Sequence, residues 1–196
     1  MKGSKARMRE GPIFFETVSV LGIQADDKTQ TRRAFRVPEG HIGHPAGIAG
    51  SKENPLRLVW AGGVLRPRYR PGDILWVRET WGVGIQLAGG IIYRADYAGK
   101  NAPLAEGQKW RPSMIMPREL ARIFLRVMDV RVERLQDISE GDIAAEGITD
   151  TARYTPGENI RRFAAFWDSF NAKRGYAWET NPWVWVYTFE RIPGYK

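Results

Sequence analysis

Apolar residues along the chain repeat with two different spacings, and the spacing typical of strands predominates. The longest signal covers residues 123–135, where valines alternate with charged residues as in a half-buried strand. Residues 183–189 are aromatic or β-branched throughout, which predicts a central strand of a sheet. Apolar residues 18–23 lead into a polar turn at Asp26 and Asp27. Shorter apolar runs predict further strands at residues 13–15, 74–77 and 91–93.

Two segments carry the longer spacing and the end signals of helices. Residues 139–142 resemble a capping motif with Ser139 as the N-cap, and a glycine follows, so a short helix is predicted over residues 140–146. Residues 155–158 supply a hydroxyl cap, a proline at the first position and an acid at the third. An amphipathic helix is predicted from there to the neighbourhood of Gly175. Its apolar residues, three and four apart, are Ile160, Phe163, Phe166, Trp167 and Phe170.

The remaining segments predict loops, and none of them divides the chain. Residues 1–11 are expected to form a disordered basic leader, followed by a single domain over residues 12–196. Glycine and proline mark long loops at residues 37–55 and 97–109. Many short strands with two helices between them predict the α+β class, with the sheet curled into a small β-barrel.

The composition excludes several classes of protein. The chain has 196 residues and no cysteine, so disulfide scaffolds, cysteine-ligated zinc and thiol nucleophiles are excluded. His41 and His44, its two histidines, lie in one glycine-rich segment, which gives little support to a histidine-centred site. No metal or other cofactor is expected. No apolar run approaches the roughly 20 residues of a membrane span, and no signal peptide is recognisable. We therefore expect a cytoplasmic protein.

Arginine dominates the positive charge. The formal net charge is +8, and 22 of the 30 basic residues are arginine. Arginine presents a planar fork that suits phosphates and bases, so RNA, DNA or a nucleotide is the natural partner of such a surface, although a basic protein can also simply be soluble. The excess is concentrated at Lys28, Arg32, Arg33 and Arg36 and again at Arg66, Arg68 and Arg70.

Residues 28–33 (KTQTRR) are the first candidate for chemistry. They combine two hydroxyls, an amine and two guanidiniums, which together suit an anion. A lysine can act as the base for a hydroxyl nucleophile if burial or nearby cations lower its pKa, and Arg32 and Arg33 would act in that direction. A solvated basic loop is the other interpretation of the same residues.

Residues 76–81 (WVRETW) are the second candidate. Arg78 and Glu79 at the end of a strand could clamp a substrate, and Trp81 could stack on a base. A structural ion pair beside core tryptophans explains the pattern equally well. Trp110, beside Arg111, is a further candidate for stacking. Most of the other aromatic residues are expected to pack in the core, notably Trp167, Trp183 and Trp185.

Glu146 stands at the end of the predicted short helix, where a surface residue is more usual than a site. Taken together, however, several segments resemble the ASCH domain family, whose fold is similar to the PUA barrel. The resemblance covers about residues 13–191 and is closest to the longer phage and prophage members. The segments that carry it are KTQTRR at 28–33, PGDILWVRETW at 71–81, WRPSMIMPR at 110–118, VRVERLQDIS at 130–139 and NPWVWV at 181–186.

The resemblance implies a β-barrel with helices around it and a cleft suited to a nucleobase or a nucleic-acid strand. The small amidohydrolases of the family remove the acetyl group of N4-acetylcytidine with a Lys-x-x-Thr pair and a glutamate. These roles would fall on Lys28, Thr31 and Glu146. Arg32, Arg33 or backbone N–H groups would then stabilise the oxyanion. The substrate-binding or nucleic-acid-binding residues would be Arg32, Arg33, Arg78, Glu79, Trp81 and Arg111.

Two assignments of the catalytic roles to these residues are open at this point. In the first, neutral Lys28 activates Thr31 as the nucleophile, and Glu146 protonates the leaving amine. In the second, Glu146 activates water and Thr31 only positions it. The acids Asp26 and Asp27 stand where relatives often have Gly-Arg, and they could pair with Lys28 and raise its pKa.

Other functions remain possible for such a domain. The chain could be a non-catalytic module that binds single-stranded nucleic acid, RNA rather than DNA, with a steep salt dependence. A ribonuclease is a third possibility, with Asp73, Glu79 and Glu146 as possible metal ligands that form no convincing cluster. In each case we expect a bacterial or phage-infected host cell as the setting.

Overall fold

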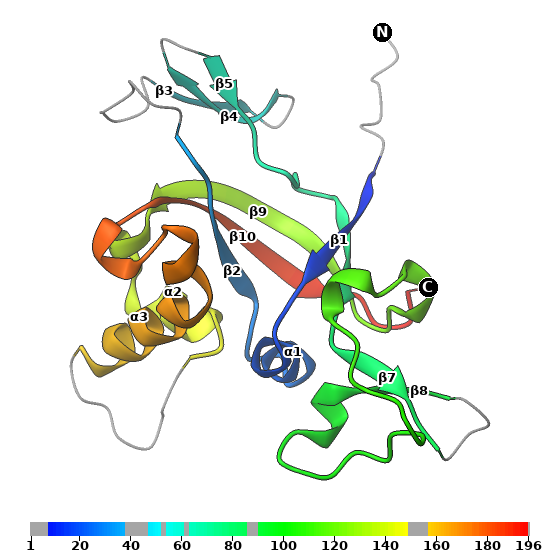
Figure 1. Cartoon of the computed structure of the whole chain (residues 1–196). Helices are drawn as coiled ribbons and strands as arrows, with labels where there is room; N and C mark the ends of the chain where they lie inside the picture. Colours follow the sequence, from blue (N-terminus) through cyan, green and yellow to red (C-terminus); the bar gives the residue numbers. More distant parts are fainter. Residues whose placement is uncertain are drawn as a thin grey trace, which may run out of the picture. The chain divides into compact units, whose positions relative to one another are not determined.

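The computed structural model describes residues 8–37, 47–51, 54–60, 63–85, 90–148 and 157–195. The protein belongs to the α+β class, as the sequence predicts. Five strands form its largest sheet, in the order β1-β6-β9-β10-β2 (Figure 1). In the described part of the chain no pairing joins the two end strands, so the sheet is open rather than a closed barrel. The strands are β1 (Glu10–Phe14), β6 (Ile74–Arg78), β9 (Phe124–Arg134), β10 (Trp183–Arg191) and β2 (Gln30–Ala34).

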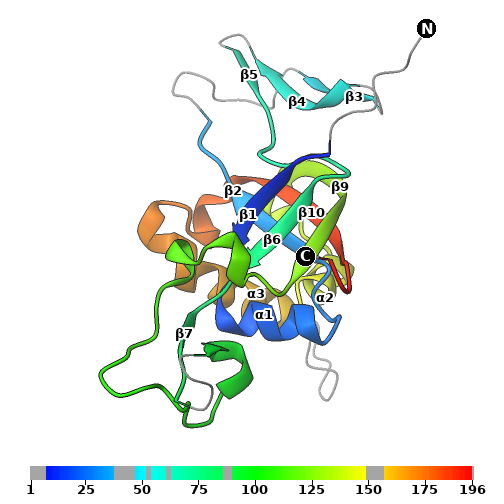
Figure 2. The same cartoon turned by 90° about the vertical axis from the view of Figure 1, so that its right-hand side faces the viewer.

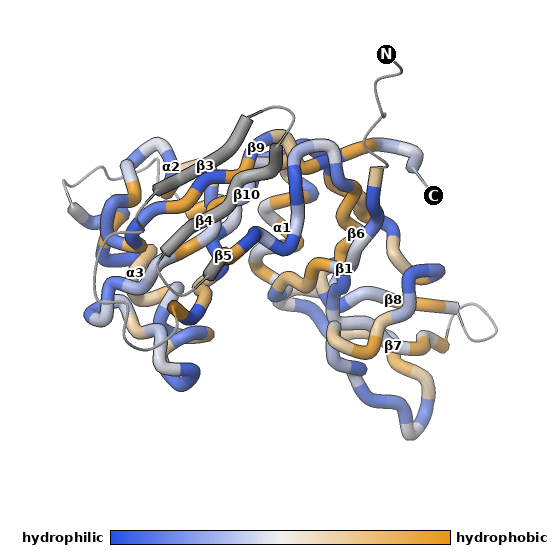
Figure 3. The backbone as a smooth tube through the Cα atoms, turned by 90° about the horizontal axis from the view of Figure 1, so that it is seen from above, coloured by the Kyte–Doolittle hydropathy of each residue, from blue (hydrophilic) through white to orange (hydrophobic). Residues whose placement is uncertain are grey.

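The chain divides into two compact units. Unit 1 comprises residues 1–27, 72–126 and 190–196, and unit 2 comprises residues 28–71 and 127–189. Strands β9 and β10 each contribute residues to both units. Apolar and polar residues alternate in the second half of β9, where buried Val130 stands between exposed Asp129 and half-buried Arg131, as in a strand with one buried face. Figure 3 shows the hydropathy along the backbone.

Unit 1 is built around a parallel pair of strands. β1 pairs with β6 in a register that runs from Glu10 opposite Ile74 to Phe14 opposite Arg78, and Figure 2 shows the two strands side by side. A small core of Ile74, Trp76 and Phe124 belongs to this unit. The other elements of the unit are α1 (Thr17–Gln24), the antiparallel strands β7 (Trp81–Val83) and β8 (Ile91–Tyr93), and the 3-10 turns η1 (Arg94–Tyr97), η2 (Ser113–Ile115) and η3 (Arg118–Leu120).

Unit 2 packs two helices against an antiparallel pair of strands. β2 pairs with β10, and the helices α2 (Glu140–Ala145) and α3 (Glu158–Asn171) cover one side of the pair (Figure 1). Residues of β10, α2 and α3 form the core of this unit: Val184, Val186, Ile143, Phe163 and Trp167. A three-stranded sheet of β3 (Gly47–Ser51), β4 (Asn54–Trp60) and β5 (Gly63–Leu65) and the 3-10 turns η4 (Leu135–Asp137), η5 (Ala172–Arg174) and η6 (Trp178–Thr180) complete it.

Most of the predicted elements are confirmed. The long strand, the two short apolar strands at β6 and β8, and the central position of β10 agree with the sequence pattern. Ser139 caps α2 in a capping box with Asp142. The 3-10 turn after α3 ends at Gly175, which takes a left-handed conformation. Residues 98–109 contain only turns and an isolated bridge, in agreement with the predicted loop.

The sequence pattern assigned no element to residues 17–24, which form α1; its buried residues Val20 and Ile23 lie three positions apart, on one face of the helix. Three predicted boundaries were wrong. Residues 47–51, inside the predicted loop 37–55, form β3, since backbone pairing with β4 defines that strand. The remaining two concern the ends of elements: α3 starts after Gly157, and β1 starts at Glu10 inside the predicted leader. Residues 1–7, 38–46, 52–53 and 149–156 lie outside the described residues.

Candidate active site

The start of β2 and the end of α2 are joined through their backbones. The capping box at Ser139 fixes where α2 begins, and the helix ends at its C-cap residue, Glu146. The backbone N–H of Thr29 donates to the carbonyl of Ala145 at 2.8 Å, and Lys28 forms an isolated antiparallel bridge with Glu146. This pairing brings together two side chains that are 118 residues apart in the sequence.

The Lys28 ammonium donates to both the side chain and the backbone of Glu146. The distance from Nζ is 2.5 Å to the carboxylate Oε2 and 2.9 Å to the carbonyl oxygen. Lys28 is 3% exposed and Glu146 is 5% exposed. Burial lowers the pKa of Lys28, and the charge and hydrogen bond of Glu146 oppose that shift without reversing it. Lys28 therefore gives up its proton more readily than a surface lysine, to an acceptor already in contact.

Arg32 holds the other oxygen of Glu146 from the same strand. Its Nη1 lies 3.1 Å from Oε1 of Glu146 and donates to Gln30 at 2.7 Å. Its Nη2 lies 2.6 Å from Oε1 of Glu133 and 3.4 Å from Oδ2 of Asp142. The Arg32 side chain is completely buried, and its guanidinium contacts the carboxylates of Glu133, Asp142 and Glu146. We name the five ionised residues the Glu146 cluster: Lys28, Arg32, Glu133, Asp142 and Glu146.

Asp142 connects the cluster to the cap of α2. Burial would raise its pKa, but hydrogen bonds from Ser139, Gln30 and Arg131 outweigh this effect and lower the pKa to about 2. Arg131 donates to Asp142 at 2.7 Å and to Glu133 at 3.0 Å. The sequence interpretation used Asp142 only as a helix signal and gave Glu133 and Arg131 no role. Alternation along β9 was the only signal for these two, and it does not reveal their partners.

Thr31 and Arg33 lie on the opposite face of β2 from Arg32. Successive side chains of a strand point to opposite faces, and directly paired residues share a face. Thr31 is paired with Tyr187, and Arg33 with Trp185. Burial raises the pKa of Tyr187 to about 12. The structure therefore joins Lys28, Arg32 and Glu146 by hydrogen bonds and places Thr31 at the same strand but on its other face.

In unit 1, one arginine binds both carboxylate oxygens of Glu79. Its two carboxylate oxygens accept hydrogen bonds from Nε and Nη2 of Arg122 at 2.8 and 2.9 Å, and Nη1 of Arg122 donates to Asp96 at 2.8 Å. Burial raises the pKa of Glu79, while the hydrogen bonds and charge of Arg122 oppose the rise. Glu79 is thus half of a structural ion pair, but its partner is Arg122 and not the adjacent Arg78, which donates to the carbonyl of Met114.

Two arginines of unit 1 stack on tryptophan rings. The Arg78 guanidinium lies 4.6 Å from the ring centroid of Trp76, and that of Arg111 lies 4.8 Å from the centroid of Trp81. Arg111 is exposed, but Trp81 is only 6% exposed. Trp81 is therefore covered and offers no open platform for a base, whereas the outer face of Arg111 is available.

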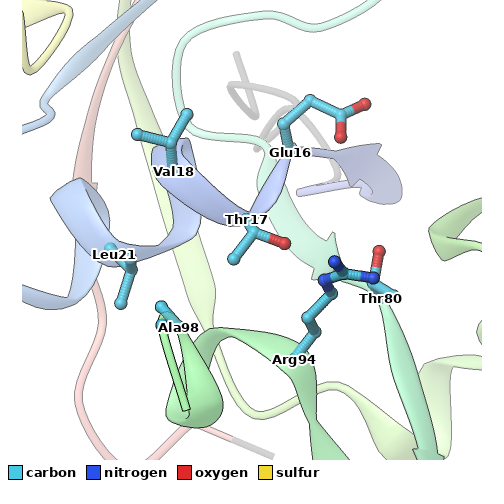
Figure 4. A pocket seen from close by; sticks show the side chains of 8 residues that line it. Glu16, Thr17, Val18, Leu21, Thr80, Arg94 and Ala98 are labelled. Carbon is cyan, nitrogen blue, oxygen red and sulfur yellow. The ribbon is translucent and has the colours of Figure 1, made fainter. Parts of the chain in front are cut away.

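An open pocket also lies within unit 1, and none of the predicted site residues lines it, although Thr80 stands between the predicted residues Glu79 and Trp81 (Figure 4). It has a volume of about 530 Å³, and its walls come from α1, Thr80 and η1. Arg94 and Glu16 supply its charged side chains. Neither was singled out from the sequence, because neither belongs to a recognisable motif.

The described residues contain neither a metal-ligand cluster nor a membrane-spanning helix. In the described ranges no three or more His, Cys, Asp or Glu residues are grouped so that they could hold a metal ion. His41 and His44 lie outside those ranges. Among the described helices, none combines the length and the apolar character needed to cross a bilayer.

Comparisons with known proteins find no matching family model, no matching curated protein and no matching solved structure.

Proposed function

We propose that this protein is a hydrolase of the N4-acyl amide of cytidine-type nucleosides and an ASCH-like, PUA-related domain. The observation that carries the proposal is the buried contact between Lys28 Nζ and Glu146 Oε2 at 2.5 Å. The Lys-x-x-Thr and glutamate pattern of the family resemblance falls on these two residues and Thr31. A barrel-like curl of the open five-stranded sheet is part of the same proposal.

The contacts favour water, rather than Thr31, as the nucleophile. Glu146 takes a proton from water, and the resulting hydroxide adds to the acyl carbonyl to form a tetrahedral oxyanion. When the C–N bond breaks, the Lys28 ammonium gives its proton to the departing N4 amine. The products are cytidine and the carboxylic acid, and the proton on Glu146 returns to Lys28 through their existing hydrogen bond. Thr31 lies on the opposite face of β2 from Arg32, so in this scheme it contributes only indirectly, through the packing of β2.

Arg32 supports this chemistry from the far side of the carboxylate. By binding Oε1 of Glu146 at 3.1 Å, it keeps Oε2 directed to Lys28. The burial that lowers the pKa of Lys28 also matters, because a general acid transfers its proton most effectively when its pKa is near the working pH. The cluster thus supplies an acid and a base in contact, and Arg32 holds the second oxygen of the base.

Chromatography of N4-acetylcytidine incubated with the protein tests the proposal. We expect cytidine from the parent chain and no detectable cytidine from Lys28→Met or Glu146→Gln, with circular dichroism showing that each variant is folded. Lys100→Ala is the matched control, because Lys100 is exposed in a turn of unit 1. Absence of cytidine from the folded parent, or full activity of folded Lys28→Met, would overturn the proposal.

Replacement of Thr31 distinguishes the two assignments of the catalytic roles, in which either water or the Thr31 hydroxyl is the nucleophile. With water as the nucleophile, Thr31→Val reduces the rate but leaves turnover measurable. With Thr31 as the nucleophile, the same variant is inactive, and mass spectrometry of the parent detects an acyl group on Thr31. The second result would mean that the Thr31 hydroxyl, and not water, attacks the acyl carbonyl.

A nucleic-acid-binding module is the second candidate, and the stacked arginines favour it. The net charge of +8 and the exposed guanidinium of Arg111 over Trp81 suit a phosphate backbone. Fluorescence anisotropy with single-stranded RNA tests it. This candidate predicts binding that weakens steeply with salt and weakens further in Arg111→Ala, whereas binding unchanged by salt would exclude it.

A further inference from the structure

The pocket of unit 1 has no part in the hydrolysis of the N4-acyl amide. Its volume of about 530 Å³ falls within the roughly 300–1,000 Å³ of small-molecule sites. None of its lining residues belongs to the Glu146 cluster, and all of them belong to unit 1. Figure 4 shows side chains from α1, from Thr80 and from η1 around the hollow. The pocket is therefore a separate candidate for binding.

Arg94 supplies an uncommitted positive charge in this pocket. Figure 4 shows its guanidinium extending to the region of Thr17 and Thr80. Within the described ranges, the Arg94 guanidinium contacts the ring of Trp110, whose centroid lies 6.0 Å from its Cζ atom. Its N–H donors have no carboxylate there, in contrast to those of Arg122. A guanidinium beside two hydroxyls is a suitable site for a carboxylate or a phosphate.

The other lining residues restrict the size and charge of the ligand. Val18 is 58% exposed and Leu21 is 37% exposed, so they offer apolar surface beside the polar end. Glu16 also lines the pocket and would repel a second negative charge. A ligand with one anionic group and a short apolar part satisfies both conditions, and a polyanion does not.

The polar wall of the pocket is held rigidly by neighbouring contacts. The backbone N–H of Arg94 donates to the carbonyl of Thr80 at 2.9 Å. Arg122 then binds Glu79, which precedes Thr80, and Asp96 in η1. These contacts fix η1 against the end of β6, so little order has to be gained when a ligand binds. The Glu79 ion pair, which the proposed hydrolysis does not use, therefore supports the wall of this pocket.

We propose that this pocket binds a small organic anion, whose single carboxylate or phosphate lies on Arg94 and whose apolar part lies against Leu21. The two anion types share the same recognition chemistry, two oxygen acceptors that face the two parallel N–H donors of a planar guanidinium. The proposal is independent of the hydrolysis of N4-acetylcytidine, because it involves no residue of the Glu146 cluster.

Nuclear magnetic resonance of the full chain tests the site with two probes. Sodium butyrate tests the carboxylate with an apolar tail, dimethyl phosphate tests the phosphate as a singly charged anion, and sodium chloride controls for ionic strength. We expect at least one probe to give saturable shifts at the amides of Thr17, Thr80 and Ala98. Arg94→Gln should weaken binding at least tenfold. Arg126→Gln, which changes an exposed arginine paired with Glu190 in the same unit, should leave binding unchanged.

Either probe alone would support the site and identify the preferred anion. Linear shifts with both probes, shifts spread over many arginines, or equal affinity in the parent and folded Arg94→Gln would overturn the proposal. Cytidine release is measured on the same samples as a separate readout. Failure of the pocket is then distinguishable from failure of the hydrolase proposal.

Discussion

Each carboxylate oxygen of Glu146 has its own cation. Lys28 binds Oε2 at 2.5 Å, and Arg32 binds Oε1 at 3.1 Å. Burying these charges is costly, and the direct contacts offset that cost only while all the partners remain. The pKa of Lys28 reflects two opposing effects: burial lowers it, and the charge and hydrogen bond of Glu146 raise it by less. A single truncation therefore leaves a buried charge with fewer partners.

This dependence predicts strong coupling between Lys28 and Glu146. We expect Lys28→Met or Glu146→Gln alone to lower the free energy of unfolding by about 3 kcal/mol, the usual effect of breaking a buried pair. The double variant should lose clearly less than the sum, because it leaves neither charge unpaired. Urea unfolding of the four proteins measures the cycle. Additive losses would contradict a direct interaction.

Gly147 allows the backbone to turn immediately beside Lys28. Its φ is +77°, and a Cβ at this position would lie 3.1 Å from Cβ of Lys28. We expect Gly147→Ala to lower the free energy of unfolding by about 1–2 kcal/mol from the left-handed conformation, with an additional loss from crowding Lys28. Gly99→Ala is the control, because Gly99 has φ +72° and no atom within 4 Å of the added Cβ. Equal losses in the two variants would show that the contact with Lys28 has no cost.

At the scale of elements, α2 depends on an ion network as well as on its own cap. Asp142 both closes the capping box with Ser139 and binds Arg131. Its pKa of about 2 lies below the value of 3.8 that the group would have when unfolded. The Asp142 carboxylate therefore binds a proton less readily in the folded state than in the unfolded state. The resulting stability is complete above pH 3.8 and is lost as the pH falls to about 2.

This linkage predicts an acid-sensitive contribution from a single residue. We expect Asp142→Asn to lower the free energy of unfolding by about 2 kcal/mol near neutral pH and by much less near pH 2. Denaturant unfolding of the parent and the variant at both pH values measures the difference. The same loss at both values would show that the charge of Asp142 does not contribute.

The elements were largely predictable from the sequence, and the cluster was not. Period-two alternation indicates β9 because one face of the strand is buried, and the cap at Ser139 indicates α2 because it is a local interaction. Arg32 meets Glu133 and Glu146 across 101 and 114 residues, and no local pattern encodes such distant partners. The family resemblance singled out Lys28 and Glu146 and gave Arg32 a substrate-binding role, but it did not indicate the contacts by which Arg32 joins Glu146 to Glu133 of β9.

The helix α1 shows why a local pattern can also mislead. Its residues include β-branched side chains that favour strands, and burial against the rest of unit 1 overrides that preference. Asp26, which the sequence made a possible partner of Lys28, instead accepts hydrogen bonds from Arg191 at 2.9 and 3.0 Å. It has φ 60°, a left-handed conformation that ends the segment after α1. These outcomes depend on tertiary contacts.

For the whole molecule, the net charge suggests more unpaired arginines at the surface than the structure has. Although 22 arginines give most of the charge of +8, several are committed to internal acids. Arg32 and Arg131 are bound within unit 2, and Arg122 is bound within unit 1. Unit 2 therefore contains a buried ion cluster, and unit 1 contains exposed arginines and a pocket. The proposed hydrolysis depends on the first of these.

The pH dependence of N4-acetylcytidine hydrolysis tests the role of Lys28 in the proposed reaction. Single-turnover cytidine release, measured from acid to alkaline pH, should lose activity on the basic side at a pKa below the roughly 10.4 of an ordinary lysine. This limb reports the Lys28 ammonium, whose pKa is lowered by burial. Folded Lys28→Met should show no cytidine at any pH. No turnover by the folded parent, or an unchanged profile in Lys28→Met, would contradict the account.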